Sequence, residues 1–205
     1  CTMHSRDSAL KIGTETWGNI RNIILSDCVV WDCSRAVSIW TRDGGTISDI
    51  TIHHVTGNTR RYADGAIPGP GAPRWWGKGE PVFFSSTKRR GSDRIPGKIS
   101  GVVMDHIRLR SESCIFLGGE SYAPIEDIRL ENMDILWTQQ GPHTPGVFDE
   151  QPSQRDVYEH EIPCVYARSV NGLTVSGRLR VDGSLSGVIR KKQILEDCED
   201  VQVKG

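Results

Sequence analysis

The sequence predicts an all-β fold, a right-handed, single-stranded parallel β-helix of about six to seven coils with two inserted loops. Three observations predict it. An unusual apolar spacing recurs along the chain, a second short segment with alternating apolar residues precedes its copies, and a helical period of 3.6 is nowhere sustained beyond one or two turns. In such a solenoid each coil buries its apolar face against its neighbours, so equivalent residues stack.

The first repeated segment places apolar residues at offsets 0, 3, 5 and 8. Its copies start at Ile20, Ile47, Ile99, Ile125, Val170 and Cys198. These starts lie 27, 52, 26, 45 and 28 residues apart, so two of the gaps contain one period of about 26 residues plus an insertion. The eighth position fails in the Val170 copy, and the chain ends before it in the Cys198 copy.

The second segment is a short run with alternating apolar residues. It reads ALKIG, AVSIW, PVFFS, CIFLG and CVYAR, starting at residues 9, 36, 81, 114 and 164. Alternation with a period of two is typical of a strand with one buried face. Two short strands in each turn, with Gly, Asn and Asp at the corners, indicate a parallel β-helix.

The composition excludes several classes of partner. The chain has 25 basic and 26 acidic residues and a net charge of −1, which gives no electrostatic footprint for nucleic acid or an anionic membrane. No apolar run approaches the roughly 20 residues that span a bilayer. Four of the six cysteines fall on strand positions, where they are predicted to be small buried hydrophobes: Cys1, Cys28, Cys114 and Cys164. We therefore expect structural cysteines and no metal site.

The chain is predicted to form one domain over residues 1–205, with insertions at about 57–81 and 139–163. CTMHSRDSALKIG, at the start, matches CVVWDCSRAVSIW position for position, so we expect residue 1 to be an internal cut that truncates the domain. A lipidated Cys1 of a mature lipoprotein is the alternative. The open end of a coil stack exposes unpaired backbone N–H and C=O groups, which favour pairing with another strand. Missing N-terminal coils or a second copy of the chain would cap this end.

Several long strings carry a resemblance to a known family. ALKIGTET, RDGGTI, WWGKGEP and DEQPS followed by HEIP resemble a divergent bacterial branch of glycoside hydrolase family 28, the polygalacturonase-like β-helix enzymes. The resemblance covers residues 1–140 well and extends more loosely to about residue 203. It implies a secreted or periplasmic protein that hydrolyses a polysaccharide or oligosaccharide with a pair of carboxylates and no cofactor.

The sequence departs from the motifs of that family. The Asn-Thr-Asp and Asp-Asp motifs would lie upstream of Cys1. RDSA stands in place of Gly-His-Gly, with Asp7 or Ser8 in the position of the His, and Ser38, Ile39 and Trp40 stand in place of Arg-Ile-Lys. In the family that Arg and Lys bind the carboxylate of the substrate, whereas a Trp face suits the C–H side of a pyranose ring. The sequence therefore predicts a sugar that is not a uronate.

Candidate substrate-binding residues fall on one strand face and on the first insertion. The outward column of the second segment holds Lys11, Ser38, Trp40, Phe83, Ser85 and Phe116. Exposed aromatic residues there would form a sugar-binding groove, unless the insertions fold over them. Trp75 and Trp76 offer either a sugar platform or a latch for the loop. Arg42 and Lys78 complete the set.

Four carboxylates lie within reach of this face: Asp7, Glu15, Asp43 and Glu80. Glycoside hydrolysis needs two, separated by roughly 5–5.5 Å for retention or 6.5–9.5 Å for inversion. Structural ion pairs at the corners are the alternative. His54 and His106 are predicted to form a corner ladder with Asp27 and Asn132 rather than a metal site.

A glycoside hydrolase is the leading hypothesis for function. The alternatives are a non-catalytic glycan-binding β-helix and an inert C-terminal fragment of such a hydrolase. The role of the second insertion, which contains Asp149, Glu150, His160 and Glu161, stays open at this point.

Overall fold

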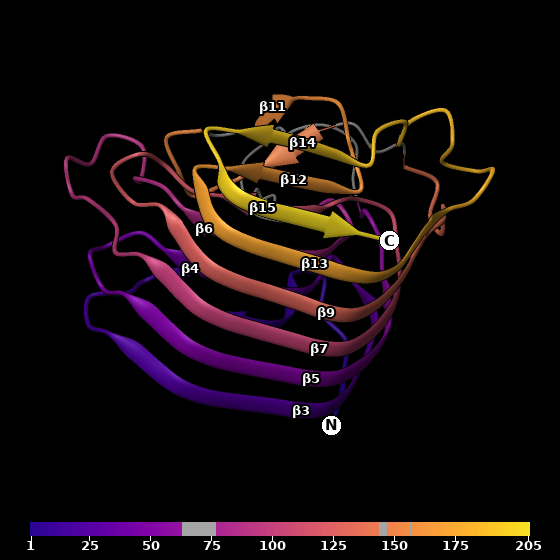
Figure 1. Ribbon diagram of the computed structural model, residues 1–205, viewed down its shortest axis with the longest axis horizontal. Helices are drawn as coiled ribbons and strands as arrows, with labels where there is room; N and C mark the ends of the chain where they lie inside the picture. The colour runs from indigo at the N-terminus through magenta and orange to yellow at the C-terminus, as the bar shows by residue number, and fades with distance from the viewer. Residues whose placement is uncertain (63–76, 144–146, 156) are drawn as a thin grey trace.

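The computed structural model describes residues 1–62, 77–143, 147–155 and 157–205. These residues form strands and no helix. The chain alternates between two parallel sheets, one of long strands and one of short strands, as Figure 1 shows. This confirms the predicted all-β class and is the arrangement expected of a parallel β-helix.

The long-strand sheet has the order β1-β3-β5-β7-β9-β13-β15. Its strands are β1 (Thr2–Met3), β3 (Ile20–Cys33), β5 (Ile47–Thr59), β7 (Ile99–Ser111), β9 (Ile125–Trp137), β13 (Val170–Val181) and β15 (Glu199–Lys204). They lie one above another and curve around one side of the molecule (Figure 1).

The short-strand sheet has the order β14-β12-β8-β6-β4-β2. Its strands are β2 (Ser8–Ile12), β4 (Arg35–Thr41), β6 (Glu80–Ser86), β8 (Ile115–Gly118), β12 (Val165–Arg168) and β14 (Gln193–Glu196). A separate antiparallel pair, β10 (Val147–Asp149) and β11 (Val157–Glu159), lies in the connection between β9 and β12.

The register of the long strands confirms the repeat read from the sequence. Residues at the same offset are paired across neighbouring strands: Ile20 with Ile47, Ile47 with Ile99, Ile99 with Ile125, and Ile125 with Val170. In the central strands these side chains are fully buried. The core therefore consists of stacked columns of equivalent residues between the two sheets.

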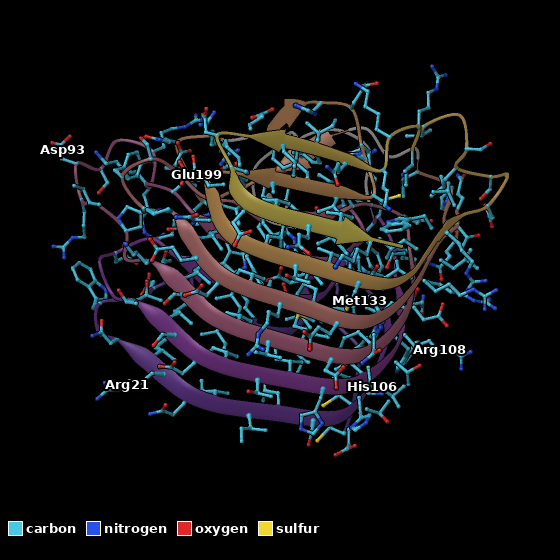
Figure 2. All side chains as sticks on the ribbon, in the orientation of Figure 1. Arg21, Asp93, His106, Arg108, Met133 and Glu199 are labelled. Atoms are coloured by element: carbon cyan, nitrogen blue, oxygen red, sulfur yellow. The ribbon has the colours of Figure 1, made fainter. Side chains whose placement is uncertain are left out.

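The predicted corner column is also present. Asp27, His54, His106 and Asn132 all have positive φ values, between 50° and 56°. The rings of His54 and His106 lie 5.2 Å apart, and Asn132 Nδ2 donates to Asp105 Oδ1 at 2.8 Å. Figure 2 shows His106 on the bend of the long strands. No cluster of three or more His, Cys, Asp or Glu side chains suited to a metal occurs in the described part of the chain.

Long connections join the sheets at three places. Residues 60–79 join β5 to β6, residues 87–98 join β6 to β7, and residues 138–164 join β9 to β12. Trp75 and Trp76, predicted to contact sugar, lie outside the described residues. All six cysteines are free thiols; Cys28, Cys114 and Cys164 are buried as predicted, whereas Cys1 is exposed, so the prediction for it was wrong. Over the described ranges, no helix has the length and apolar character needed to cross a membrane.

Candidate active site

The outer face of the short-strand sheet is not the exposed aromatic groove that the sequence predicts. Ser38, Trp40, Phe83, Ser85 and Phe116 are each at most 1% exposed. Phe83 stacks on Phe116 with ring centres 4.6 Å apart, and Phe116 stacks on Tyr166 at 5.2 Å. The expected exposure was wrong, and the alternative, that an insertion folds over these residues, is confirmed.

The second insertion provides the cover. The ring of Phe148, from β10, lies 5.0 Å from that of Phe116 and 4.8 Å from that of Tyr166. The next residue but one, Glu150, accepts hydrogen bonds from Ser85 Oγ at 2.8 Å and from Arg168 Nη2 at 3.0 Å. The insertion therefore closes this side of the solenoid, which settles a question that the sequence left open.

Arg42 fastens the insertion to the sheet. Its guanidinium is fully buried and donates to the carbonyl oxygens of Thr41, Ser85, Glu150 and Pro152 and to Ser85 Oγ. A guanidinium has five N–H donors, and these five bonds engage each of its three nitrogens. The structure thus places Arg42, predicted to bind substrate, in a structural clamp.

Glu80 and Lys78 lie in a second buried clamp. Glu80 Oε2 lies 3.3 Å from Arg35 Nε and accepts the backbone N–H of Lys78 at 2.7 Å. Lys78 Nζ lies 3.5 Å from Asp149 Oδ2, and Arg35 Nη2 donates to the carbonyl oxygen of Asp149 at 2.8 Å. Burial lowers the pKa of Lys78 and raises that of Asp149 to about 6. This arrangement corresponds to the ion-pair alternative for Glu80.

One cavity opens at the edge of the covered face. It has a volume of about 250 Å³ and is lined by Lys11, Thr14, Trp40, Arg89, Gln151 and Pro152; we call it the Trp40 pocket. The Lys11 ammonium lies 5.6 Å from the centre of the Trp40 ring. The pocket joins two predicted residues from β2 and β4 to the 87–98 connection and the second insertion.

Two hydrogen-bond donors in the lining of this pocket have no partner among the described residues. They are Trp40 Nε1 and Gln151 Nε2, and both atoms are buried. A buried donor without a partner costs about 1–3 kcal/mol, so native proteins rarely leave two in one place. The described part of the chain thus leaves two polar groups of the pocket lining without a hydrogen bond.

Three of the predicted carboxylates lie near the pocket, because each is close to Lys11 or Arg89, the two cations in its lining. Asp7 Oδ2 lies 2.9 Å from Lys11 Nζ. Asp43 binds Arg89 with both oxygens, at 2.8 Å to Nε and 2.9 Å to Nη2, and this contact lowers the pKa of Asp43. Glu15 Oε1 lies 4.0 Å from the same Nη2 and its side chain is 77% exposed.

Asp43 and Glu15 both approach Arg89 Nη2, which limits the distance between their two carboxylates. Asp43 Oδ2 and Glu15 Oε1 lie 2.9 Å and 4.0 Å from Arg89 Nη2, so these oxygens are at most 6.9 Å apart (2.9 Å plus 4.0 Å). Asp7 is farther from Glu15 along the sheet, because the β2 strand between them is about 13 Å long. The structure thus brings two of the predicted carboxylates, Glu15 and Asp43, close together at this pocket.

Sequence reasoning missed Thr14, Arg89, Gln151 and Pro152. Arg89 belongs to the basic run KRR, at 88–90, which begins two residues after the last residue of β6. A basic run so close to the end of a strand is a signal that could have pointed to it. Thr14 directly precedes Glu15, so the same IGTET string contains both. Nothing in the local pattern identifies Gln151, because its place depends on how the second insertion folds back over the sheet.

Comparisons of the chain with models of protein families, with curated proteins and with solved structures find no significant match.

Proposed function

We propose that this chain is a carbohydrate-active β-helix that binds one sugar residue of a glycan in the Trp40 pocket. The two unpartnered donors, Trp40 Nε1 and Gln151 Nε2, carry the proposal. Sugar hydroxyl and ring oxygens are acceptors, and they would supply the missing hydrogen bonds without any charge.

The charges around the pocket favour a neutral sugar. Lys11 is paired with Asp7, and Arg89 is paired with Asp43 and approached by Glu15. These five groups sum to a charge of −1, so a uronate would meet cations that are already neutralised. We therefore keep the hypothesis of a sugar that is not a uronate.

Hydrolysis at this pocket is a second candidate function, favoured by the spacing of Glu15 and Asp43. The bound of 6.9 Å on their oxygens is compatible with the carboxylate separation of a glycosidase. Arg89 keeps Asp43 ionised, which suits a base or nucleophile. Glu15, exposed beside the pocket, would supply the second carboxylate of the pair.

The wider proposal follows the family resemblance. It comprises a right-handed helix of about six to seven coils, a relationship to the polygalacturonase-like glycosidases, a secreted or periplasmic location and no cofactor. The supporting observations are the two parallel sheets and the carboxylate pair beside a Trp-containing pocket. A non-catalytic glycan-binding β-helix remains the alternative.

Binding is tested by titrating neutral and uronate-containing oligosaccharides into the protein by calorimetry. Gln151→Met and Trp40→Phe remove the two donors and are expected to weaken binding about tenfold each. Trp137→Phe is the matched control, because Trp137 is equally buried and its Nε1 donates to Ser113 O, away from the pocket. Binding that instead depends on the exposed Trp31 would contradict the Trp40 pocket.

Hydrolysis is tested by released reducing ends with the same glycans. Glu15→Gln is expected to lower release by about 10²–10⁴-fold while binding is kept. Glu126→Gln, on the long-strand sheet, should change neither. Binding without release by the unaltered chain would favour the non-catalytic alternative.

A further inference from the structure

The outer face of the long-strand sheet contains a second cavity, whose lining has three arginines. It has a volume of about 360 Å³, and we call it the arginine groove. It is lined by Thr56, Gly57, Arg108, Leu109, Arg110, Asp134, Leu136 and Arg180. Three guanidinium groups thus face one carboxylate, in a chain whose overall net charge is −1.

The register of the strands explains this concentration of arginines. Arg108 on β7 is paired with Asp134 on β9, and Arg110 with Leu136, which is in turn paired with Arg180 on β13. Residues two apart on a strand share a face, so Arg108 and Arg110 project together. Figure 2 shows Arg108 extending outward from β7 close to the bend at His106.

Asp134 holds two of the three arginines in place. Its Oδ2 lies 3.3 Å from Arg108 Nε and its Oδ1 lies 2.8 Å from Arg180 Nη2. The arginines lower the pKa of Asp134, so it stays ionised. One carboxylate cannot satisfy three guanidinium groups, which carry five N–H donors each. Arg180 Nε is buried without a hydrogen-bond partner in the described structure, and Arg110 has no ion pair there.

We propose that the arginine groove binds a single tetrahedral oxyanion ester, a sulfate or phosphate monoester of a small molecule or sugar. Guanidinium forks match the geometry of such oxygens and bind them with charge-assisted hydrogen bonds. Nucleic acid is a poorer candidate, because binding it requires cations spread along many phosphates, and here three surround one cavity. The groove uses no residue of the Trp40 pocket, so either proposal can fail without the other.

The test measures binding of glucose 6-sulfate, glucose 6-phosphate and glucose by calorimetry, at constant ionic strength balanced with sodium chloride. We expect both esters to bind and glucose not to bind at this groove. Arg110→Gln should weaken ester binding about tenfold, and Arg110→Lys should give an intermediate loss. Arg21→Gln, an exposed arginine on β3 that Figure 2 labels, is the matched control and should bind like the unaltered chain.

The pH dependence separates the two esters. A phosphate monoester gains its second charge near pH 6, so its affinity should rise between pH 5.5 and 8, whereas that of the sulfate ester should not. The tighter ligand at pH 8 identifies the preferred ester. Equal weakening by Arg21→Gln and Arg110→Gln would overturn the proposal. So would binding of a 12-nucleotide single-stranded DNA with no binding of either ester.

Discussion

Left-handed residues explain the apolar spacing that reveals the fold. Strict alternation would place buried residues at offsets 0, 2, 4 and 6, but the long strands use 0, 3, 5 and 8. Residues with positive φ occupy offset 2 (Asn22, Asp49, Gly101, Asp127 and Gly172) and offset 7 (Asp27, His54, His106, Asn132 and Gly177). Each bends the strand and adds one residue between two buried ones, so the chain turns around the core without losing its pairing.

These positions favour Gly, Asn and Asp, because the left-handed conformation costs other L-residues about 1–2 kcal/mol. We therefore expect Asp127→Val on β9 to lower the free energy of unfolding by at least that much, and Asp127→Gly to change it by less than about 0.5 kcal/mol. Arg129→Val, at an exposed position two residues later on the same strand, is the control and should change little. Urea unfolding measures all three. Equal losses for the two valine variants would contradict the role of φ.

Asp149 makes stability depend on pH. Burial raises its pKa from 3.8 to about 6, although Lys78 and Arg35 oppose the shift. Because the pKa of Asp149 is higher in the folded than in the unfolded protein, the folded state binds the proton more tightly, and protonation stabilises the fold. This contribution is fully present below the unfolded-state pKa of 3.8 and is lost as the pH rises through about 6. Asp149→Asn should therefore gain stability relative to the unaltered chain between pH 4 and pH 7, by about 3 kcal/mol.

Urea unfolding from pH 4 to pH 7.5 measures this difference. Asp93→Asn is the control, because Asp93 lies exposed in the 87–98 connection (Figure 2) and should show no such change. A difference between the Asp149 variant and the unaltered chain that is flat with pH would show that Lys78 and Arg35 fully compensate for burial.

At the scale of elements, the strands and their register were predictable and the cover over the short-strand sheet was not. The pattern from Ile20 to Cys28 is local, and its recurrence fixes which residues pair. The burial of Phe83 and Phe116 depends on contacts with residues far along the chain: Arg35 reaches Asp149, 114 residues later. An alternating strand reads the same whether its outer face meets water or another segment, so the prediction of an exposed aromatic groove was wrong.

The covering strand β10 should be essential to the short-strand sheet. Phe148→Ala removes the ring that packs on Phe116 and Tyr166, and we expect it to cost about 3–5 kcal/mol of stability. It should also increase binding of a hydrophobic dye, because stacked aromatic rings would be uncovered. Ile95→Ala, at an exposed residue of the 87–98 connection, is the control. A cost for Phe148→Ala no larger than that of the control would mean that the insertion lies on the sheet without stabilising it.

At the scale of the whole molecule, the candidate site is built where connections from different coils meet. Lys11, Trp40, Glu15 and Asp43 were predictable, because the repeat places them at one end of neighbouring strands. Arg89 and Gln151 come from two long connections whose paths do not follow the repeat. Solenoids commonly vary in their connections while the coils stay constant. The fold could therefore be predicted from the sequence more completely than the site.

Stacked coils also predict a gradient of stability along the solenoid. Val102 and Val201 occupy one column, linked through Ile128 and Leu173, but β7 has a neighbouring strand on both sides and β15 on one. Val102 is fully buried, whereas Val201 is half-buried. Because each coil is stabilised mainly by its neighbours, Val102→Ala should cost about 2 kcal/mol and Val201→Ala less than about 1 kcal/mol.

Native-state hydrogen exchange should show the amides of β7 and β9 opening only with the whole molecule, and those of β14 and β15 opening at lower free energy. Equal protection of β9 and β15 would mean instead that the coils of the long-strand sheet unfold as one cooperative unit, without a gradient.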